Sequence, residues 1–499
     1  MKNRFLNLSK IIAKYSFVIF IFIFSFANIF VTARRYNNVN ASFDINYLFG
    51  INFINIVILL IISLIAVYLY KNNFFNVSSK KYMYLFLIFC LFVGIVWIFI
   101  NPWELVELDD AYNCYHTAIS LLSGDYGVIG YKSYINTYPH NLTLVTYFMI
   151  FIKLFGEYWA LLAIRITNLI LVIVGYYFLY KITDLMFENE KTNQMLIILM
   201  YLSTQYVFYS FMVYSNVISY TFGIISLYFF LKYYKADKLK NLFISLLFIV
   251  TSAALKNNSL IILIAELIFL IIKMIKKINY KAILILIINL LILALMTTGT
   301  VKFWEKRSGN DYSNKLPLIC WLAYGINYYE GAPGGYTNEL ERYYIENDCV
   351  TEFVSIKASQ FIRGSLNDFK EKPVIAARFY CQKFLFSFAN PEYDAFASYR
   401  RLDTGSFATD VISGNINELI FNTWDVGSTF VSIGLILYVL LNFKNINLDY
   451  LLLGVCVIGG FIFHSFWETK SIYLYQYFLL LLPYASKGIE GILEKRSKK

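Results

Sequence analysis

The stretch that decides the fold is YMYLFLIFCLFVGIVWIFI, residues 82–100, followed after a short gap by Glu107-Leu-Asp109-Asp110-Ala-Tyr112. Residues 82–100 are long and apolar enough to cross a bilayer as a helix, because a span needs roughly 20 such residues. Two adjacent carboxylates therefore emerge where this helix reaches water, where an ionised side chain costs far less than at the bilayer centre. Asp109 and Asp110 are candidate catalytic groups. Taken alone, however, the pair is better explained as the cap of a following helix.

Similar apolar runs recur along the whole chain. Of 499 residues, 59% are apolar and 15% are charged, whereas soluble proteins contain roughly 25% charged residues. These features predict an all-α polytopic membrane protein, because a transmembrane β-barrel would show short alternating segments. The net charge of +11 comes from lysines and arginines in short segments between the runs. Positive-inside topology explains this distribution, so we expect no nucleic-acid partner.

Hydropathy predicts about 12 (11–13) transmembrane helices with both ends in the cytoplasm. Seven apolar segments lie between two outer segments, and an odd number cannot begin and end on the same side. One segment within 139–211 is therefore expected to be re-entrant or half a span. Apolar residues at helical spacing in Asp110–Leu122 predict an amphipathic helix on the outer surface. Spans are expected at about 15–31, 46–70, 82–100, 139–155, 158–180, 192–211, 215–234, 241–255, 258–275, 281–300, 426–443, 448–465 and 470–485.

Four parts of the chain follow from these spans. Residues 301–425, with near-balanced charge and four prolines, are expected to form a folded but irregular extracytoplasmic domain. Cys320, Cys349 and Cys381 lie there, and one disulfide among them is a minor alternative to free thiols. No cofactor or metal motif is present. The parts are an N-terminal pair of transmembrane helices (1–81), a transmembrane core (82–300) with the first outer loop (101–138), the extracytoplasmic domain (301–425), and C-terminal transmembrane helices with a basic cytoplasmic tail (426–499).

Polar residues gather at two further places on the expected outer boundary. The segment YKSYINTYPHN, residues 131–141, precedes an apolar run, and a proline is ordinary at the start of such a helix. His140 in this segment is more often an interfacial group than a ligand. The segment HSFWETK, residues 464–470, has the groups to bind a phosphate or order a substrate. Snorkelling side chains and an aromatic belt explain it equally well.

A third segment, Trp321 to Tyr336, interleaves aromatic residues with asparagine and glycine. This composition suits sugar binding, although a plain structured turn is slightly favoured. Cations are the other candidates, because phosphate recognition uses lysine and arginine. They are Arg165, Lys256, Arg307, Arg400 and Arg401.

Together the motifs resemble those of GT-C fold glycosyltransferases, and most nearly the protein O-mannosyltransferase and aminoarabinose-transferase type. The resemblance covers roughly 82–486, and the first two spans look like an addition. It departs from the family at Asp110, where relatives have Glu, and in a proline motif without charged residues before a double proline. The acceptor class therefore stays open. The matching residues are Leu108–Tyr112 with Ala118 and Gly124, Tyr138-Pro-His-Asn141, Leu154-Phe-Gly156, and His464, Glu468, Tyr477 and Pro483.

The resemblance implies a GT-C-type bundle and an inverting sugar transfer from a polyprenyl-phosphate carrier, such as undecaprenyl phosphate. The acceptor would be a glycan, polymer, lipid or protein on the outer face of the cell membrane. Asp109 would be the base and Asp110 would orient a neighbour or the acceptor, without a metal. A cation must stabilise the leaving phosphate. The implied substrate-binding residues are Tyr112, Tyr138, His140, Asn141, Arg165, Lys256, His464, Glu468, Lys470 and Tyr477.

Two other classes of protein are alternatives. A transporter or flippase of lipid-linked saccharides would show internal repeats and buried charges at the membrane midplane. No clear repeat is present, and the charges gather at the outer boundary. A polysaccharide polymerase or ligase would also have a large outer loop, but one rich in arginine rather than led by acidic residues.

Overall fold

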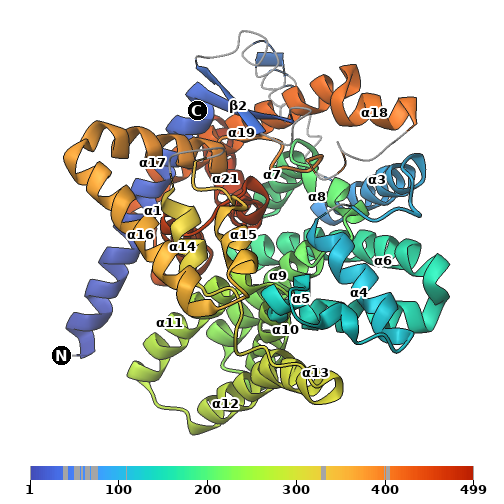
Figure 1. The fold of residues 1–499 in the computed structure, drawn as a ribbon. Coiled ribbons are helices and arrows are strands. Elements are labelled where there is room, and N and C mark those ends of the chain that lie inside the picture. The colour runs from blue at the N-terminus through green and yellow to red at the C-terminus, as the bar shows by residue number, and fades with distance from the viewer. Residues whose placement is uncertain are drawn as a thin grey trace.

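In its described residues the protein is a helical bundle with one antiparallel pair of strands (Figure 1). The structure is a computed structural model that describes residues 2–37, 43–49, 77–107, 109–327, 333–397, 399 and 405–497, together with positions 57, 60, 61, 64 and 68. The predicted all-α membrane fold is confirmed. The longer helices are α1 Lys2–Phe30, α3 Ser79–Ile100, α6 Leu142–Phe187, α9 Asn216–Ala236, α10 Leu239–Leu255, α11 Leu260–Lys276, α12 Tyr280–Ala294, α16 Thr351–Glu371, α17 Pro373–Phe388, α19 Asn415–Asn442, α20 Leu452–Phe466 and α21 Ser471–Ser497.

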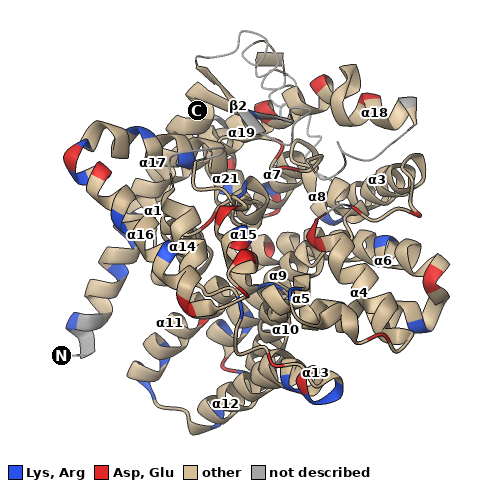
Figure 2. Cartoon of the chain, in the orientation of Figure 1, with Lys and Arg blue, Asp and Glu red and all other residues tan. Residues whose placement is uncertain are grey.

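Seven of the described helical stretches are long and apolar enough to cross a membrane, and α10 and α20 are shorter apolar helices. The number 12 is therefore not confirmed. Charged residues lie mostly at helix ends and in connections, with long uncharged stretches between them (Figure 2). The seven stretches are Leu6–Phe30, Ser79–Ile100, Pro139–Phe187, Asn216–Ala236, Asn257–Lys276, Tyr280–Ser308 and Phe407–Asn445.

The segment 139–211 differs from a series of three simple spans. The predicted runs 139–155 and 158–180 belong to α6, which kinks at Gly156, where φ is +74°. The predicted run 192–211 is interrupted: α7 covers only Glu190–Tyr201, and α8 Gln205–Phe208 follows after a break. Twelve helical residues rise about 18 Å, less than the roughly 30 Å of a bilayer core. An interrupted helix of this length is compatible with the predicted half span, which stays a prediction.

The N-terminal region corrects one prediction. Residues 46–49, expected to begin a second span, belong instead to strand β2 Phe43–Phe49, which pairs antiparallel with β1 Val31–Asn37. Tertiary contact favours the hairpin, since Ala33 N–H donates to Ala389 O at 2.8 Å and Tyr47 OH donates to Gln382 O at 3.2 Å. The rest of that expected span, 50–70, lies almost entirely outside the described residues. Helix α1 packs into the main core, where Phe17 and Phe20 are buried with residues of α19–α21. That the first two spans are an addition to the family pattern stays a prediction.

The expectation of an irregular domain at 301–425 is wrong. The segment is mostly helical: α13 Thr300–Ser308, α14 Ile319–Ile326, α15 Glu339–Glu346, α16, α17 and α18 Ser406–Ser413. Pro373 does not break a helix but begins α17, where its missing N–H costs nothing. Helix α19 crosses the expected boundary at residue 425. All six cysteines are free thiols, so the alternative of a disulfide is excluded for these described residues.

Two hydrophobic clusters position the site. The main core joins α6, α9 and α10 to α19–α21. A second cluster joins α4, Asp110–Leu122, to the first part of α6. The predicted amphipathic helix thus has the expected bounds, and its apolar face packs through residues such as Cys114, Ala118 and Leu121.

Candidate active site

Asp109 and Asp110 lie at the N-terminus of α4 in different environments. Asp109 is exposed and has φ +72° and ψ −134°, a conformation that costs a non-glycine residue about 1–3 kcal/mol. Such strain is typical of functional sites. Asp110, in the first turn, is partly buried. The surrounding structure therefore holds the two carboxylates in distinct positions.

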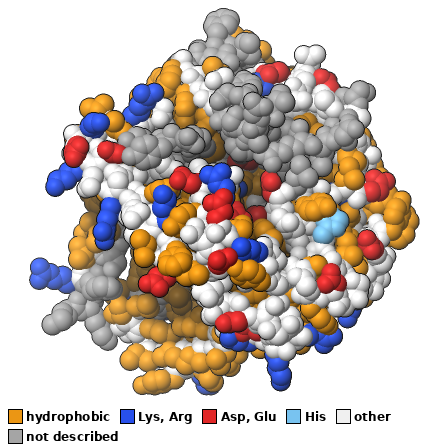
Figure 3. All heavy atoms as spheres, in the orientation of Figure 1, with side chains coloured by type: hydrophobic (Ala, Val, Ile, Leu, Met, Phe, Trp, Pro, Cys, Tyr) orange, Lys and Arg blue, Asp and Glu red, His pale blue; other side chains and the backbone are white. Residues whose placement is uncertain are grey.

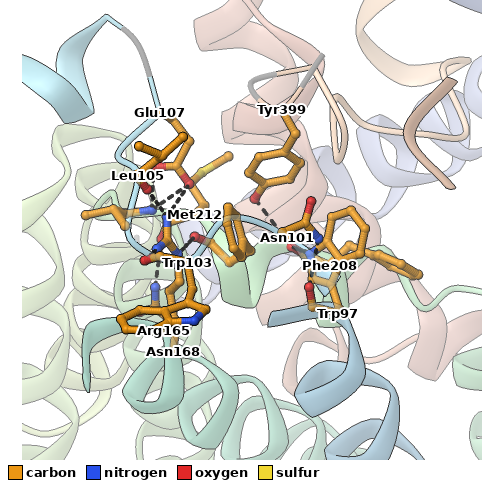
Figure 4. A network of polar contacts seen from close by, with 12 residues as sticks. Trp97, Asn101, Trp103, Leu105, Glu107, Arg165, Asn168, Phe208, Met212 and Tyr399 are labelled. Carbon is orange, nitrogen blue, oxygen red and sulfur yellow. Dashed lines mark hydrogen bonds and ion pairs between the residues drawn. The ribbon is translucent and has the colours of Figure 1, made fainter. Parts of the chain in front are cut away.

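Arg165 and Glu107 hold the loop that leads to this pair (Figure 4). The Arg165 guanidinium, fully buried, donates to Phe211 O at 2.8 Å, to Leu105 O at 2.6 Å and to Trp103 O. The nearest oxygen of buried Glu107 is 3.9 Å from Arg165 Nη2. Arg165 was a predicted phosphate ligand, but its N–H donors bind backbone carbonyls. It therefore stabilises the loop.

Asp110 joins three segments. Its carboxylate accepts hydrogen bonds from Tyr134 OH at 2.8 Å and Tyr214 OH at 3.3 Å. Tyr134 lies in the short helix α5, Tyr134–Thr137, and its hydroxyl accepts from Asn141 Nδ2 at 2.7 Å. Burial raises the pKa of both tyrosines, and the negative charge of Asp110 raises it further. Both phenols therefore stay protonated as donors to the carboxylate.

Lys256 is a cation beside this arrangement. It lies between α10 and α11, with its ammonium 4.3 Å from the ring centre of Tyr214 and 4.8 Å from that of Tyr473. Within the described part of the chain, the ammonium has no hydrogen bond or ion pair. Burial lowers the pKa of Lys256 to about 8, and Asp110 opposes the shift. This cation is therefore held in place by aromatic rings and is available to an anion.

The turn between α20 and α21 brings more charge to the same place. Lys470 Nζ is 3.9 Å from the carboxylate of Glu468, which is buried. Burial raises the pKa of Glu468, and Lys470 opposes the shift. Lys470 also lies 6.0 Å from the ring of Tyr473, which contacts Lys256. His464 and Tyr477 are buried in the helices below this turn.

An aromatic group adjoins the charged residues. The ring of Trp321 is 6.0 Å from that of Tyr138 and 6.3 Å from that of His140. The ring of Tyr336 is 5.9 Å from Lys470 Nζ. The Trp321–Tyr336 segment therefore contacts both the proline motif and the C-terminal turn, although residues 328–332 lie outside the described part.

The structure thus gathers most, but not all, of the predicted site residues. Tyr112 lies on the exposed face of α4, with its ring 4.0 Å from that of His116, and Arg165 is buried elsewhere. Arg307 pairs with Tyr126, and Arg400 and Arg401 are outside the described residues. Tyr134, Tyr214 and Tyr473 were not among the predicted site residues, although Tyr134 lies in the segment 131–141 and Tyr473 follows the turn at 464–470. Tyrosine makes up 43 of the 499 residues, so composition gave no signal for these three.

Comparison with known proteins supports the resemblance. Residues 143–304, about a third of the chain, match the model of the dolichyl-phosphate-mannose-protein mannosyltransferase family. No curated protein matches the sequence. The matched segment contains Lys256 and excludes Asp109, Asp110 and the turn at 464–470. The match supports a GT-C membrane glycosyltransferase that takes its sugar from a polyprenyl-phosphate donor.

Proposed function

We propose that this GT-C membrane glycosyltransferase moves a sugar from undecaprenyl phosphate to a cell-surface glycan, polymer, lipid or protein on the outer face of the cell membrane. The observation that carries the proposal is that Asp110 and Lys256 contact the same tyrosine, Tyr214: Asp110 accepts a hydrogen bond from its hydroxyl, and the Lys256 ammonium lies 4.3 Å from its ring centre. Sugar transfer from a phosphate needs a base for the incoming hydroxyl and a cation for the leaving group. We assign the base to Asp109, the residue before Asp110 in the chain, and the cation to Lys256.

Asp109 is proposed as the base. Its exposed carboxylate takes the proton of the acceptor hydroxyl as that oxygen bonds to the anomeric carbon. Asp110 has tyrosine donors on both oxygens, so it is better suited to fixing the start of α4 and the acceptor than to removing a proton. The bond from the anomeric carbon to the phosphate oxygen breaks in the same step, and the phosphate leaves with the electron pair.

Lys256 is proposed to stabilise the negative charge that develops on the leaving phosphate, with Lys470 in support. Among the described residues this ammonium has only aromatic partners, so its three N–H donors remain for phosphate oxygens. The neighbouring carboxylates of Asp110 and Glu468 favour the protonated lysine. Their negative charge also limits the affinity of the site for the phosphate product.

Apolar surface for the lipid chain of the donor lies next to Lys256. Helix α11 begins four residues later and exposes Leu260, Ile264 and Ile268 in one row. α12 exposes Leu284 and Leu291. Figure 3 shows hydrophobic side chains over α11 and α12 beside a hollow in this face of the molecule. A carrier with its phosphate at Lys256 can therefore lay its isoprenoid chain along α11.

A transporter of lipid-linked saccharides is the alternative that one observation favours. Glu266 is fully buried in α11, where it accepts hydrogen bonds from Ser226 at 2.6 Å and Ser245 at 3.2 Å. Acidic residues within membrane helices often belong to transport pathways. Here the two serines come from α9 and α10, so the carboxyl also joins three packed helices.

Sugar transfer in membranes distinguishes these functions. Membranes containing the protein are supplied with radiolabelled undecaprenyl-phosphate sugars, and label in non-lipid or acceptor-lipid products is measured. We expect Asp109→Asn to lower the rate by about 10²–10⁴-fold. Glu157→Gln, the same change at an exposed carboxylate on α6, is the matched control. Full activity of Asp109→Asn at normal expression would remove the assigned base.

The side of the membrane is tested separately. A reporter fused after residue 360, an exposed position on α16, should be active only outside the cytoplasm. A cytoplasmic reporter would contradict transfer at the outer face. Movement of labelled lipid across the membrane without transfer would favour the transporter.

A further inference from the structure

Lys383 is a buried lysine that no sequence motif marks. It lies on α17 with 2% of its surface exposed. Its ammonium donates to Gly325 O at 2.5 Å, Trp467 O at 2.9 Å and Ser465 O at 3.1 Å. An ammonium has three N–H donors, and here each has a backbone carbonyl. Because a buried charge is costly unless its donors are satisfied, this arrangement requires all three carbonyls to stay in place.

The three carbonyls belong to two segments that are otherwise distant in sequence. Gly325 is in α14, whereas Ser465 and Trp467 are at the end of α20. Two backbone hydrogen bonds join the same segments: Glu468 N–H donates to Trp321 O at 3.0 Å, and Thr469 N–H donates to Gly334 O at 2.9 Å. Lys383 therefore completes a junction between the Trp321–Tyr336 segment and the turn that carries Glu468 and Lys470.

Two glycines show how closely this junction is packed. A Cβ on Gly325 would lie 2.1 Å from Phe466 O, where no side chain fits. Gly334 has φ +70°, and a Cβ there would lie 2.5 Å from Lys383 Cε. Both positions need the close backbone approach that only glycine permits. The close fit leaves little freedom for the turn once the lysine is in place.

The rest of α17 continues the same contact. Ser387 Oγ is 3.2 Å from Thr469 Oγ1, and Ser471 Oγ donates to Phe386 O at 2.9 Å. Helix α17 therefore contacts the turn along its length, from Ser465 to Ser471. This makes α17, rather than the transmembrane helices alone, the support of the charged residues at 468–470.

We propose that Lys383 is a positioning residue. It holds the turn that carries Glu468 and Lys470 beside Asp110 and Lys256, and so connects α14 and α17 to the residues proposed to bind the donor phosphate. The inference rests on the proposed function, because it assigns the turn to donor binding. Lys383 touches no substrate in this account. It acts through the backbone of the turn, and its loss should be felt as misplaced donor contacts.

Hydrogen exchange on the purified full-length protein tests the junction without reference to activity. Lys383→Met keeps the length of the side chain and removes its donors. We expect amide exchange in peptides covering 465–470 to speed up by about tenfold or more, with little change in α10. Lys370→Met, an exposed lysine on α16, is the matched control. Unchanged exchange at 465–470 would overturn the inference.

Donor kinetics test the link to function. Lys383→Met should lower kcat/KM for the undecaprenyl-phosphate donor by about 10²-fold, mainly through KM, and Lys383→Arg should restore part of the loss. If Lys383→Met does not fold, Ser387→Ala, which removes the contact of α17 with Thr469 Oγ1, should show a smaller effect in the same direction. If Lys383→Met shows faster exchange but the kinetics of the wild type, the further inference is refuted and the proposed function is not. No transfer by the wild-type protein with any such donor would instead refute the proposed function.

Discussion

Arg165 and Lys256 are two buried or partly buried cations that both stack on an aromatic ring and both lie near a carboxylate. Arg165 is 3.7 Å from the ring centre of Phe211, and Lys256 is 4.3 Å from that of Tyr214. They differ in their other partners. The Arg165 guanidinium donates to three backbone carbonyls, whereas the Lys256 ammonium has no polar partner in the described residues. A cation whose N–H donors are all hydrogen-bonded within the protein stabilises the fold. A cation whose N–H donors are available can bind a ligand.

The largest effect should come from Arg165→Met. It leaves Glu107 buried without its cation, and breaking a buried pair in this way costs about 3–5 kcal/mol. We expect a large fall in the thermal unfolding temperature and in the amount of protein in membranes. Arg363→Met, at an exposed arginine on α16, is the control. A stable Arg165→Met protein that lacks only transfer would contradict the structural role and return Arg165 to the site.

Lys256→Met should have the opposite signature. Transfer should fall by about 10²–10³-fold, because the leaving phosphate loses its cation, while the unfolding temperature stays near that of the wild type. The variant is compared with Lys277→Met, at an exposed lysine beyond the other end of α11. If Lys256→Met fails to fold, Lys256 has a structural role like that of Arg165, and the proposed difference between the two cations is wrong.

The pH dependence of donor binding should sharpen the contrast. The pKa of Lys256 is lowered to about 8, so the ammonium is charged below that pH and loses its proton above it. Donor KM should therefore rise above pH 8, by about tenfold for each further pH unit. Lys256→Arg, which stays charged, should move this rise to higher pH. An unchanged profile in Lys256→Arg would show that another group titrates.

The smallest effects should come from the tyrosines on Asp110. Each donates one hydrogen bond to a charged group, a contact worth about 1.5–3 kcal/mol. Tyr134→Phe should lower transfer more than Tyr214→Phe, because its bond is shorter, 2.8 Å against 3.3 Å. Tyr214→Phe keeps the ring that contacts Lys256 and removes only the hydroxyl, so any loss of activity in this variant reports on Asp110. Equal activity of both variants and the wild type would remove Asp110 from the site.

The sequence by itself determined the membrane class, most helix positions and the bounds of α4. These properties depend on local hydropathy and on apolar residues repeated at helical spacing, which a single chain displays. It also identified Asp109, Asp110, Lys256 and the turn at 464–470 as candidates, while their common location remained a prediction.

Only the tertiary structure decided which cations are occupied and which are available. Arg165, Lys256 and Lys383 differ in the carbonyls that surround them, and those carbonyls come from residues 46 to 84 positions away for Arg165 and Lys383. The strand at 43–49 likewise follows from contacts with distant segments. Hydropathy sums over neighbours in sequence, whereas the state of a buried charge depends on neighbours in space.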